Sequence, residues 1–168
     1  ITDVQFLSAW SVIAGQKPAG QNVLIADWSS DWSGLGVAHM LALSGHKVRL
    51  LSGASTCGES IPAIVRDQWV GELESLNVEL ICYARFFGAQ GRTAFFQHTI
   101  NGEAIICEDV DAIVSCYPPQ SNNDCDWMSD LITPDNPSLQ IKKIGDALAP
   151  RTVEEAVLEG VKAAWSIR

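Results

Sequence analysis

The chain has 168 residues, of which 47% are hydrophobic and 18% are charged, as expected for one packed domain with room for part of a second. A net charge of −9 argues against nucleic acid and anionic membranes as partners, and no run approaches the ~20 apolar residues of a membrane span. The five cysteines form no C-x-x-C pair, which predicts reduced thiols in a cytoplasmic protein and no metal or iron–sulfur site within the chain.

Residues 1–20 are expected to form a linker helix. Apolar residues recur near a helical period between residues 2 and 14, Asp3 is placed to cap the helix, and Gly15 is placed to end it. The stretch from Gln16 to Gln21 reads as a connection.

The next residues carry the pattern of a parallel α/β unit. Residues 22–27 predict a buried strand, residues 34–43 a helix of small residues ending at Ser44-Gly45, and residues 47–51 a second strand. A strand, a turn, a helix and a strand within about thirty residues are typical of the first unit of a nucleotide-binding sheet.

The following segments complete an α/β domain over residues 21–138. We expect a helix, a strand, three short antiparallel strands and a last buried strand, in that order, at residues 61–76, 78–82, 85–87, 93–99, 103–107 and 111–116. The Asn-Gly pair before the third short strand is a strong signal for a tight turn. The fold class predicted is a Rossmann-like nucleotide-binding domain with a parallel sheet and a three-stranded antiparallel meander. This order is similar to that of the pyridine-nucleotide domain of flavoproteins that bind two dinucleotides.

The glycine pattern of the first strand–helix turn is incomplete. A dinucleotide site needs G-x-G-x-x-G, in which the first two glycines admit the pyrophosphate and the third packs the helix on the strand. If Gly34 is the third glycine, the first two positions fall on Ser29 and Asp31. A carboxylate there would repel a pyrophosphate, so the sequence indicates a degenerate NAD(P) site.

A second register would begin the motif at Gly34 and Gly36, but it places His39 at the third position and the motif inside the helix. In either register the second strand ends at Ser52 and offers no acid for an adenine ribose. Gly34 and Gly36 remain the candidate cofactor-binding residues of this turn.

Trp28 and Trp32 lie in the same turn. Their rings either pack over the edge of the sheet or fill the volume that a nicotinamide nucleotide would otherwise take. The sequence leaves both interpretations open.

Residues 139–168 follow a different pattern. Thr152 and Glu155 form a capping-box pair, so a helix is expected from Thr152. Ala156, Gly160 and Ala164 give this helix a small-residue face, which we expect to anchor the segment by close packing. Asp146 precedes the helix by a short loop, where its carboxylate can accept hydrogen bonds from a ligand hydroxyl.

The chain resembles the trimethylamine dehydrogenase, histamine dehydrogenase and 2,4-dienoyl-CoA reductase group of NADH:flavin oxidoreductases. The resemblance rests on three stretches of sequence: Ile144-Gly145-Asp146-Ala147-Leu148-Ala149-Pro150-Arg151, the EEAVLEG run after it, and Gly45-His46-Lys47-Val48. The resemblance covers nearly the whole chain. It implies that residues 21–138 are a pyridine-nucleotide-type domain and that residues 139–168 are the return segment of a flavin- or ADP-binding domain.

The resemblance also implies cofactors and partners. FAD or ADP is expected at Gly145, Asp146 and Ala147, whereas FMN and an iron–sulfur cluster belong to an N-terminal part absent from this sequence. The partner is then the remainder of a parent flavoenzyme. The alternatives are an autonomous adenine-nucleotide-binding module and an inter-subunit interaction domain, which would include a homo-oligomer.

No catalytic residue is assigned. His39, His46 and His98 are far apart, and none adjoins a nucleophile pattern. Glu154 and Glu155 are better explained by the helix start than by acid–base chemistry. We therefore expect oxidoreductase chemistry in the parent protein and none in this chain alone.

Overall fold

The computed structural model describes residues 3–122, 124, 126–132 and 139–166. The chain divides into two compact units, residues 1–118 and residues 119–168. The first unit ends at Pro118, before the domain boundary expected at residue 138.

The first unit is built on a five-stranded sheet in which every neighbouring pair is parallel. The strand order is β1-β8-β2-β3-β4. The five strands are β1 (Gln5–Ser8), β2 (Asn22–Asp27), β3 (Lys47–Ser52), β4 (Glu79–Ile81) and β8 (Ala112–Cys116).

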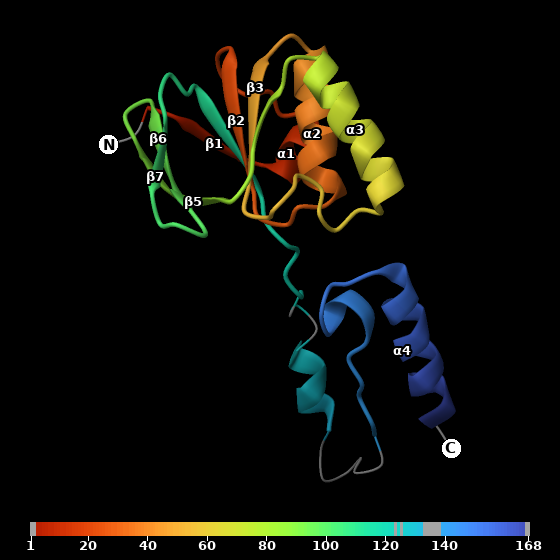
Figure 1. The fold of residues 1–168 in the computed structure, drawn as a ribbon. Coiled ribbons are helices and arrows are strands. Elements are labelled where there is room, and N and C mark those ends of the chain that lie inside the picture. The colour runs from red at the N-terminus through yellow and green to blue at the C-terminus, as the bar shows by residue number, and fades with distance from the viewer. Residues whose placement is uncertain (1–2, 123, 125, 133–138, 167–168) are drawn as a thin grey trace. The chain divides into compact units, whose positions relative to one another are not determined.

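Helices cover one face of this sheet and a separate antiparallel sheet covers the other (Figure 1). The helices are α1 (Ala9–Ile13), α2 (Trp32–Leu43) and α3 (Ala63–Ser75), and the antiparallel sheet consists of β5 (Ala84–Gln90), β6 (Thr93–His98) and β7 (Ala104–Cys107). The predicted α/β fold class with its three-stranded meander is thereby confirmed.

The central strand β2 shows why the sequence reads as a continuous apolar run. Val23 and Ile25 belong to the core beneath the helices, and Leu24 and Ala26 belong to the core beneath the antiparallel sheet. Successive side chains of a strand point to opposite faces, so a strand covered on both sides is apolar at every position.

The expected linker helix is wrong in its first half. Residues 5–8 form β1, which pairs in parallel with β8, and only Ala9–Ile13 are helical. Ser8 caps this short helix by accepting a hydrogen bond from the Ser11 amide (3.1 Å). Leu7 and Val12 both reach the helix-side core, so a strand followed by one helical turn produces the spacing that resembles a single longer helix.

The second unit contains little regular structure. It holds two 3₁₀ segments, at Asp126–Leu131 and Gly145–Ala147, and the helix α4 (Val153–Ser166). Residues 141–144 form no strand with any of the described residues. The C-terminal helix itself is confirmed.

Candidate functional site

The nucleotide site of a parallel sheet lies beyond the carboxyl ends of its strands. In this protein, Asp27 at the end of β2 stands between Ser52 of β3 and Cys116 of β8 in the sheet register. All three residues are buried. The loop after β2 therefore starts from a row of buried polar and thiol groups.

The backbone amides of that loop donate hydrogen bonds to neighbouring residues. The amides of Trp28 and Ser29 both donate to the Cys116 carbonyl (2.9 and 3.2 Å), and the Ser29 hydroxyl donates to the same oxygen (3.0 Å). The Ser30 amide donates to Asp27 Oδ1 (2.9 Å). Amides at this position would bind a pyrophosphate in a working site, and here they already have partners within the protein.

Asp31 is the N-cap of α2. Its Oδ1 accepts hydrogen bonds from the Ser33 amide (2.8 Å) and the Ser33 hydroxyl (2.6 Å). The helix begins at Trp32 rather than at the predicted Gly34, because its cap, Asp31, lies three residues before the glycine. The carboxylate thus occupies the helix N-terminus that an anion would otherwise use.

Gly34 lies where the helix meets the strand. A Cβ atom built on Gly34 would lie 2.3 Å from Asp27 Oδ2, whereas one on Gly36 would meet no atom within 4 Å. Gly34 therefore has the packing geometry of the third glycine of the motif. The assignment of Gly34 and Gly36 as cofactor-binding residues stays a prediction.

Asp27 is the buried charge of this edge, and the sequence reading missed it. Its exposed fraction is 2%, and its Oδ2 atom has no hydrogen-bond partner among the residues that the structure describes. Burial raises the pKa of Asp27 to about 6, against the opposing hydrogen bond from the Ser30 amide. The polar residue that ends the apolar run of residues 23–26 is the signal that could have found it.

The two tryptophans of the loop have different surroundings. The Trp28 ring lies against Gly53 at the end of β3, where a Cβ on the glycine would be 2.5 Å from the ring, and the Arg85 guanidinium lies 5.9 Å from the ring centroid. Trp32 is 54% exposed on α2. Trp28 therefore packs over the edge of the sheet at the end of β3, where a dinucleotide-binding fold receives the adenine ribose. The interpretation that it fills the volume of a nicotinamide nucleotide stays a prediction.

Ser30 joins this loop to the one after β3, residues 53–60. Its hydroxyl contacts Ser52 Oγ (3.1 Å), donates to the Thr56 carbonyl (3.2 Å) and accepts from the Glu59 amide (3.2 Å). The Ser60 amide donates to the Ser30 carbonyl (3.0 Å). Hydrogen bonds therefore join the two loops at the place where a dinucleotide-binding fold has its crevice.

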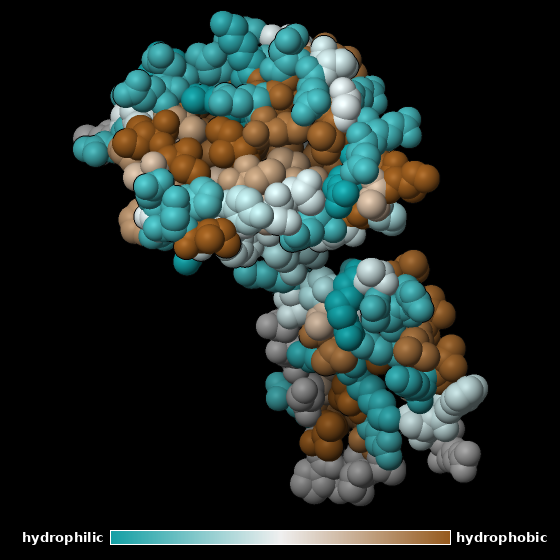
Figure 2. Space-filling view, viewed as in Figure 1, coloured by the Kyte–Doolittle hydropathy of each residue, from teal (hydrophilic) through white to brown (hydrophobic). Residues whose placement is uncertain are grey.

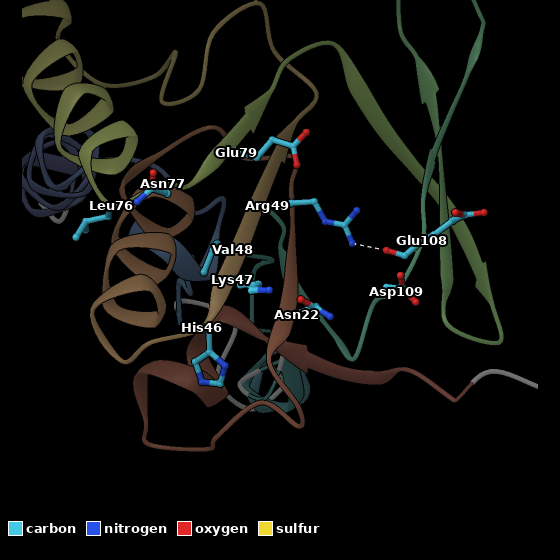
Figure 3. A pocket seen from close by; sticks show the side chains of 10 residues that line it. All are labelled: Asn22, His46, Lys47, Val48, Arg49, Leu76, Asn77, Glu79, Glu108 and Asp109. Atoms are coloured by element: carbon cyan, nitrogen blue, oxygen red, sulfur yellow. Dashed lines mark hydrogen bonds between the residues drawn. The ribbon is translucent and has the colours of Figure 1, made fainter.

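The histidines do not gather at this edge. His39 bonds to Glu72 (2.9 Å) and contacts the Trp69 ring, linking α2 to α3. His46 lines a hollow of about 480 Å³ at the opposite edge, where β2, β3 and β4 begin (Figure 3). Acidic and basic side chains both line this hollow, so its charge favours no single class of ion.

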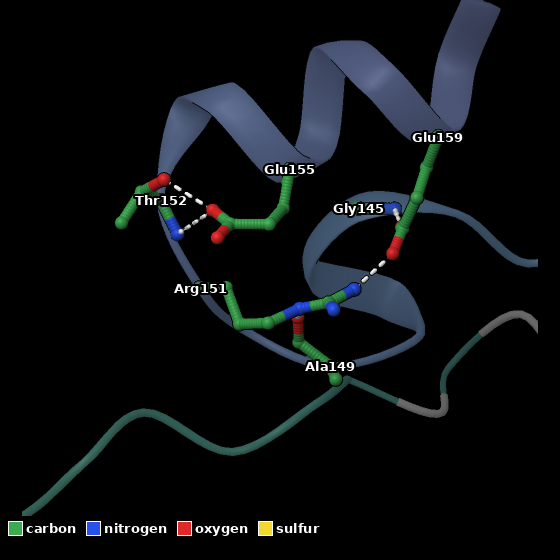
Figure 4. A network of polar contacts seen from close by, with 6 residues as sticks. All are labelled: Gly145, Ala149, Arg151, Thr152, Glu155 and Glu159. Carbon is green, nitrogen blue, oxygen red and sulfur yellow. Dashed lines mark hydrogen bonds and ion pairs between the residues drawn. The ribbon is translucent and has the colours of Figure 1, made fainter.

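The Gly-Asp segment of the second unit is held by Glu159 (Figure 4). Glu159 Oε2 accepts from the Gly145 amide (2.7 Å), and Arg151 pairs with Glu159 Oε1. The Asp146 and Ala147 side chains are exposed. Among the predicted flavin-site residues, Asp146 therefore has an accessible carboxylate, whereas the Gly145 amide is already bonded.

The start of α4 shows one half of the predicted capping box. The Thr152 amide donates to Glu155 Oε2 (3.1 Å), and the Thr152 hydroxyl bonds to the same carboxylate oxygen. The side-chain hydroxyl of Thr152 is the leading cause that lowers the pKa of Glu155.

The expectation that the small-residue face anchors α4 is wrong within this chain. Ala156 contacts the position of a Cβ on Gly145 (3.6 Å), but a Cβ on Gly160 would meet no atom within 4 Å, and Ala164 is exposed. Apolar residues of α4 are exposed as well, namely Val153, Val157, Leu158, Val161 and Trp165. Figure 2 shows apolar side chains gathered along this helix.

Replacing Gly160 with leucine should therefore leave the thermal stability of this chain unchanged or slightly raised. Leucine favours a helix interior over glycine by about 0.8 kcal/mol, and the space at Gly160 is open. Circular dichroism melts of Gly160→Leu and Gly160→Ala provide the measurement. A lower melting temperature for leucine alone would show that the face is packed.

No family model matches the chain. The probable N-methylproline demethylase of Rhizobium meliloti is 24% identical over 183 residues, which cover 93% of this chain and 26% of that protein. The structure of histamine dehydrogenase from Rhizobium sp. 4-9 matches with a TM-score of 0.85 and 18% identity over 98% of this chain. The chain has the fold of a part of histamine dehydrogenase.

A second structure agrees with this histamine dehydrogenase-type fold. The 6-hydroxypseudooxynicotine amine oxidase of Pseudomonas geniculata N1 matches with a TM-score of 0.83 and 18% identity over 96% of this chain. The resemblance noted in the sequence is thereby confirmed at the level of the fold. The chain spans about a quarter of the length of these relatives.

Two kinds of feature are absent from the described part of the chain. The described residues contain no group of three or more His, Cys, Asp or Glu side chains that could hold a metal ion. No helix in the described part of the chain is long and apolar enough to cross a membrane.

Proposed function

We propose that this chain is the C-terminal nucleotide-binding-type domain of a flavin-dependent oxidoreductase, of the amine dehydrogenase or enoate reductase type, in which the NAD(P) crevice is closed. The fold shared with parts of two amine-oxidising enzymes supports this assignment. Substrate binding and redox chemistry then belong to the part of the parent protein that lies outside this chain.

The closed crevice is inferred from two side chains, one at the position of the pyrophosphate and one at the position of the ribose. Asp31 caps the helix N-terminus, and Trp28 lies against Gly53 at the end of β3. A pyrophosphate would meet the carboxylate, and a ribose would meet the indole ring. The residues present therefore do not fit NAD(P).

The second unit has the features of a segment that is completed by another part of the parent protein. Helix α4 has no buried residue, and the described residues of its own unit leave its apolar side chains exposed. We assign these side chains to contact with the rest of the parent polypeptide. Asp146 is the residue that would hold a hydroxyl group of FAD or ADP there.

Calorimetric titration with NADH and with ADP tests the closed crevice. The wild-type chain should bind neither at low-micromolar concentration. The double variant Ser29→Gly, Asp31→Gly should bind NADH at least about tenfold more tightly, since a carboxylate ~6 Å from a phosphate charge costs roughly 2–3 kcal/mol before screening. The gain should stay incomplete, because Ser52 offers no carboxylate to the ribose.

Two matched variants separate the causes. Asp31→Asn keeps a good capping residue and removes only the charge. Trp28→Ala opens the space beside Gly53 and leaves the charge in place. Low-micromolar binding of NADH by the wild type would contradict the proposal and would make the loop after β2 a working site.

A further inference from the structure

Cys57 and Cys82 form a thiol pair beside the closed crevice. Their sulfur atoms lie 3.9 Å apart, although the residues are 25 positions apart in the sequence. Cys57 lies in the loop after β3, and Cys82 lies between β4 and β5. The Tyr83 amide donates to the Ala54 carbonyl (2.9 Å), so the two backbone segments are already joined beside the pair.

The two thiols differ in their access to solvent. Cys57 is 2% exposed and belongs to the helix-side core, whereas Cys82 is partly exposed and packs against that core. Burial raises the pKa of the Cys57 thiol, so Cys57 resists direct attack by a dissolved oxidant. Cys82 is the thiol that a small oxidant reaches first.

We propose that Cys57 and Cys82 form a reversible disulfide when the protein meets a hydroperoxide. The Cys82 sulfur attacks the peroxide, forming a sulfenic acid and releasing water. The Cys57 sulfur then attacks the Cys82 sulfur, loses its proton, and the hydroxyl group of the sulfenic acid leaves as water. Two thiols and one hydrogen peroxide thus give one disulfide and two waters, with two electrons passing to the peroxide.

The bond would fix the loop after β3 in its present place. A disulfide needs its sulfurs about 2.0 Å apart, so the side chains must turn toward each other from 3.9 Å. The loop in which Cys57 lies also holds Thr56 and Glu59, both of which bond to Ser30. Oxidation would therefore add a covalent restraint to the crevice already crossed by these hydrogen bonds.

Peptide mapping of the folded chain tests the proposal. After treatment with equimolar hydrogen peroxide and alkylation of the remaining thiols, tryptic digestion without reductant should give peptide 50–66 linked to peptide 67–85. Each of these peptides contains one cysteine, so the linkage is unambiguous. The melting temperature should rise by about 5–10 °C on oxidation and return with dithiothreitol.

Cysteine variants provide the controls. Cys57→Ser should accumulate a sulfenic acid on Cys82 that dimedone traps, and Cys82→Ser should show no shift in melting temperature with peroxide. Cys107→Ser should still form the linkage, because Cys107 lies in the core on the other face of the sheet. Absence of the linked peptide from folded wild type, or its formation only in urea, would overturn the proposal.

Discussion

Replacing Gly34 with alanine is expected to destabilise the protein by about 3 kcal/mol, at the upper end of the cost of overpacking. The new methyl group would lie 2.3 Å from Asp27 Oδ2 and 2.6 Å from Asp27 Cγ. Both residues are buried, so the helix start must move away from the strand. Urea denaturation gives the free energy of unfolding that checks this value.

Gly36→Ala is the matched control on the same helix. A Cβ there would meet no atom within 4 Å, and alanine in a helix interior is favoured over glycine by about 0.5–1 kcal/mol. The two substitutions should therefore move the unfolding midpoint in opposite directions. A shift of the same sign for both would show that Gly34 is not in close contact with Asp27.

Asp27→Asn is expected to change the pH dependence of stability most. In the folded protein the pKa of Asp27 is raised from 3.8 to about 6. The contribution of protonated Asp27 to the free energy of unfolding is therefore fully present below about pH 4 and is lost as the pH rises through about 6. At pH 7.5 the charged form costs about 3 kcal/mol. The variant should exceed the wild type by up to that amount at pH 7.5 and converge with it below pH 4.

Asp111 gives a comparison of opposite sign. Its carboxylate accepts from the Asn22 and Gln21 amides (2.9 Å each) and pairs with Arg92, and the backbone hydrogen bonds are the leading cause that lowers its pKa. The contribution of Asp111 to the free energy of unfolding is present above pH 4 and is lost in acid, so Asp111→Asn should weaken the protein most at neutral pH.

Equal pH profiles for Asp27→Asn and the wild type would show that Asp27 is not a buried charge.

The sequence predicted most elements of the first unit because their patterns are local. The strand at residues 22–27 is apolar at its four central positions and agrees with β2. The Asn-Gly turn separates β6 from β7 as expected. The strand at Gln5–Ser8 was missed because it has four residues and its partner, β8, lies more than a hundred residues along the chain. No local sequence pattern near residue 5 indicates that pairing.

The sequence indicated the strand–helix turn but not the contacts within it. The glycine pattern places Gly34 as the third glycine of the turn and a carboxylate at Asp31, and both are visible in one short stretch of sequence. The cap that Asp31 forms, and the contact of Trp28 with Gly53, depend on where side chains point. The thiol pair of Cys57 and Cys82 depends on two loops meeting across the sheet edge.

The first 20 residues also protect the sheet. Strand β1 covers one side of β8, whose Ile113 and Val114 are buried. Removal of β1 would leave a row of unpaired backbone groups along an apolar strand, and such an edge pairs readily with other chains. Strand β1 therefore replaces an apolar edge of five residues with a shorter edge of four, and any truncation that isolates this unit has to be made upstream of Gln5.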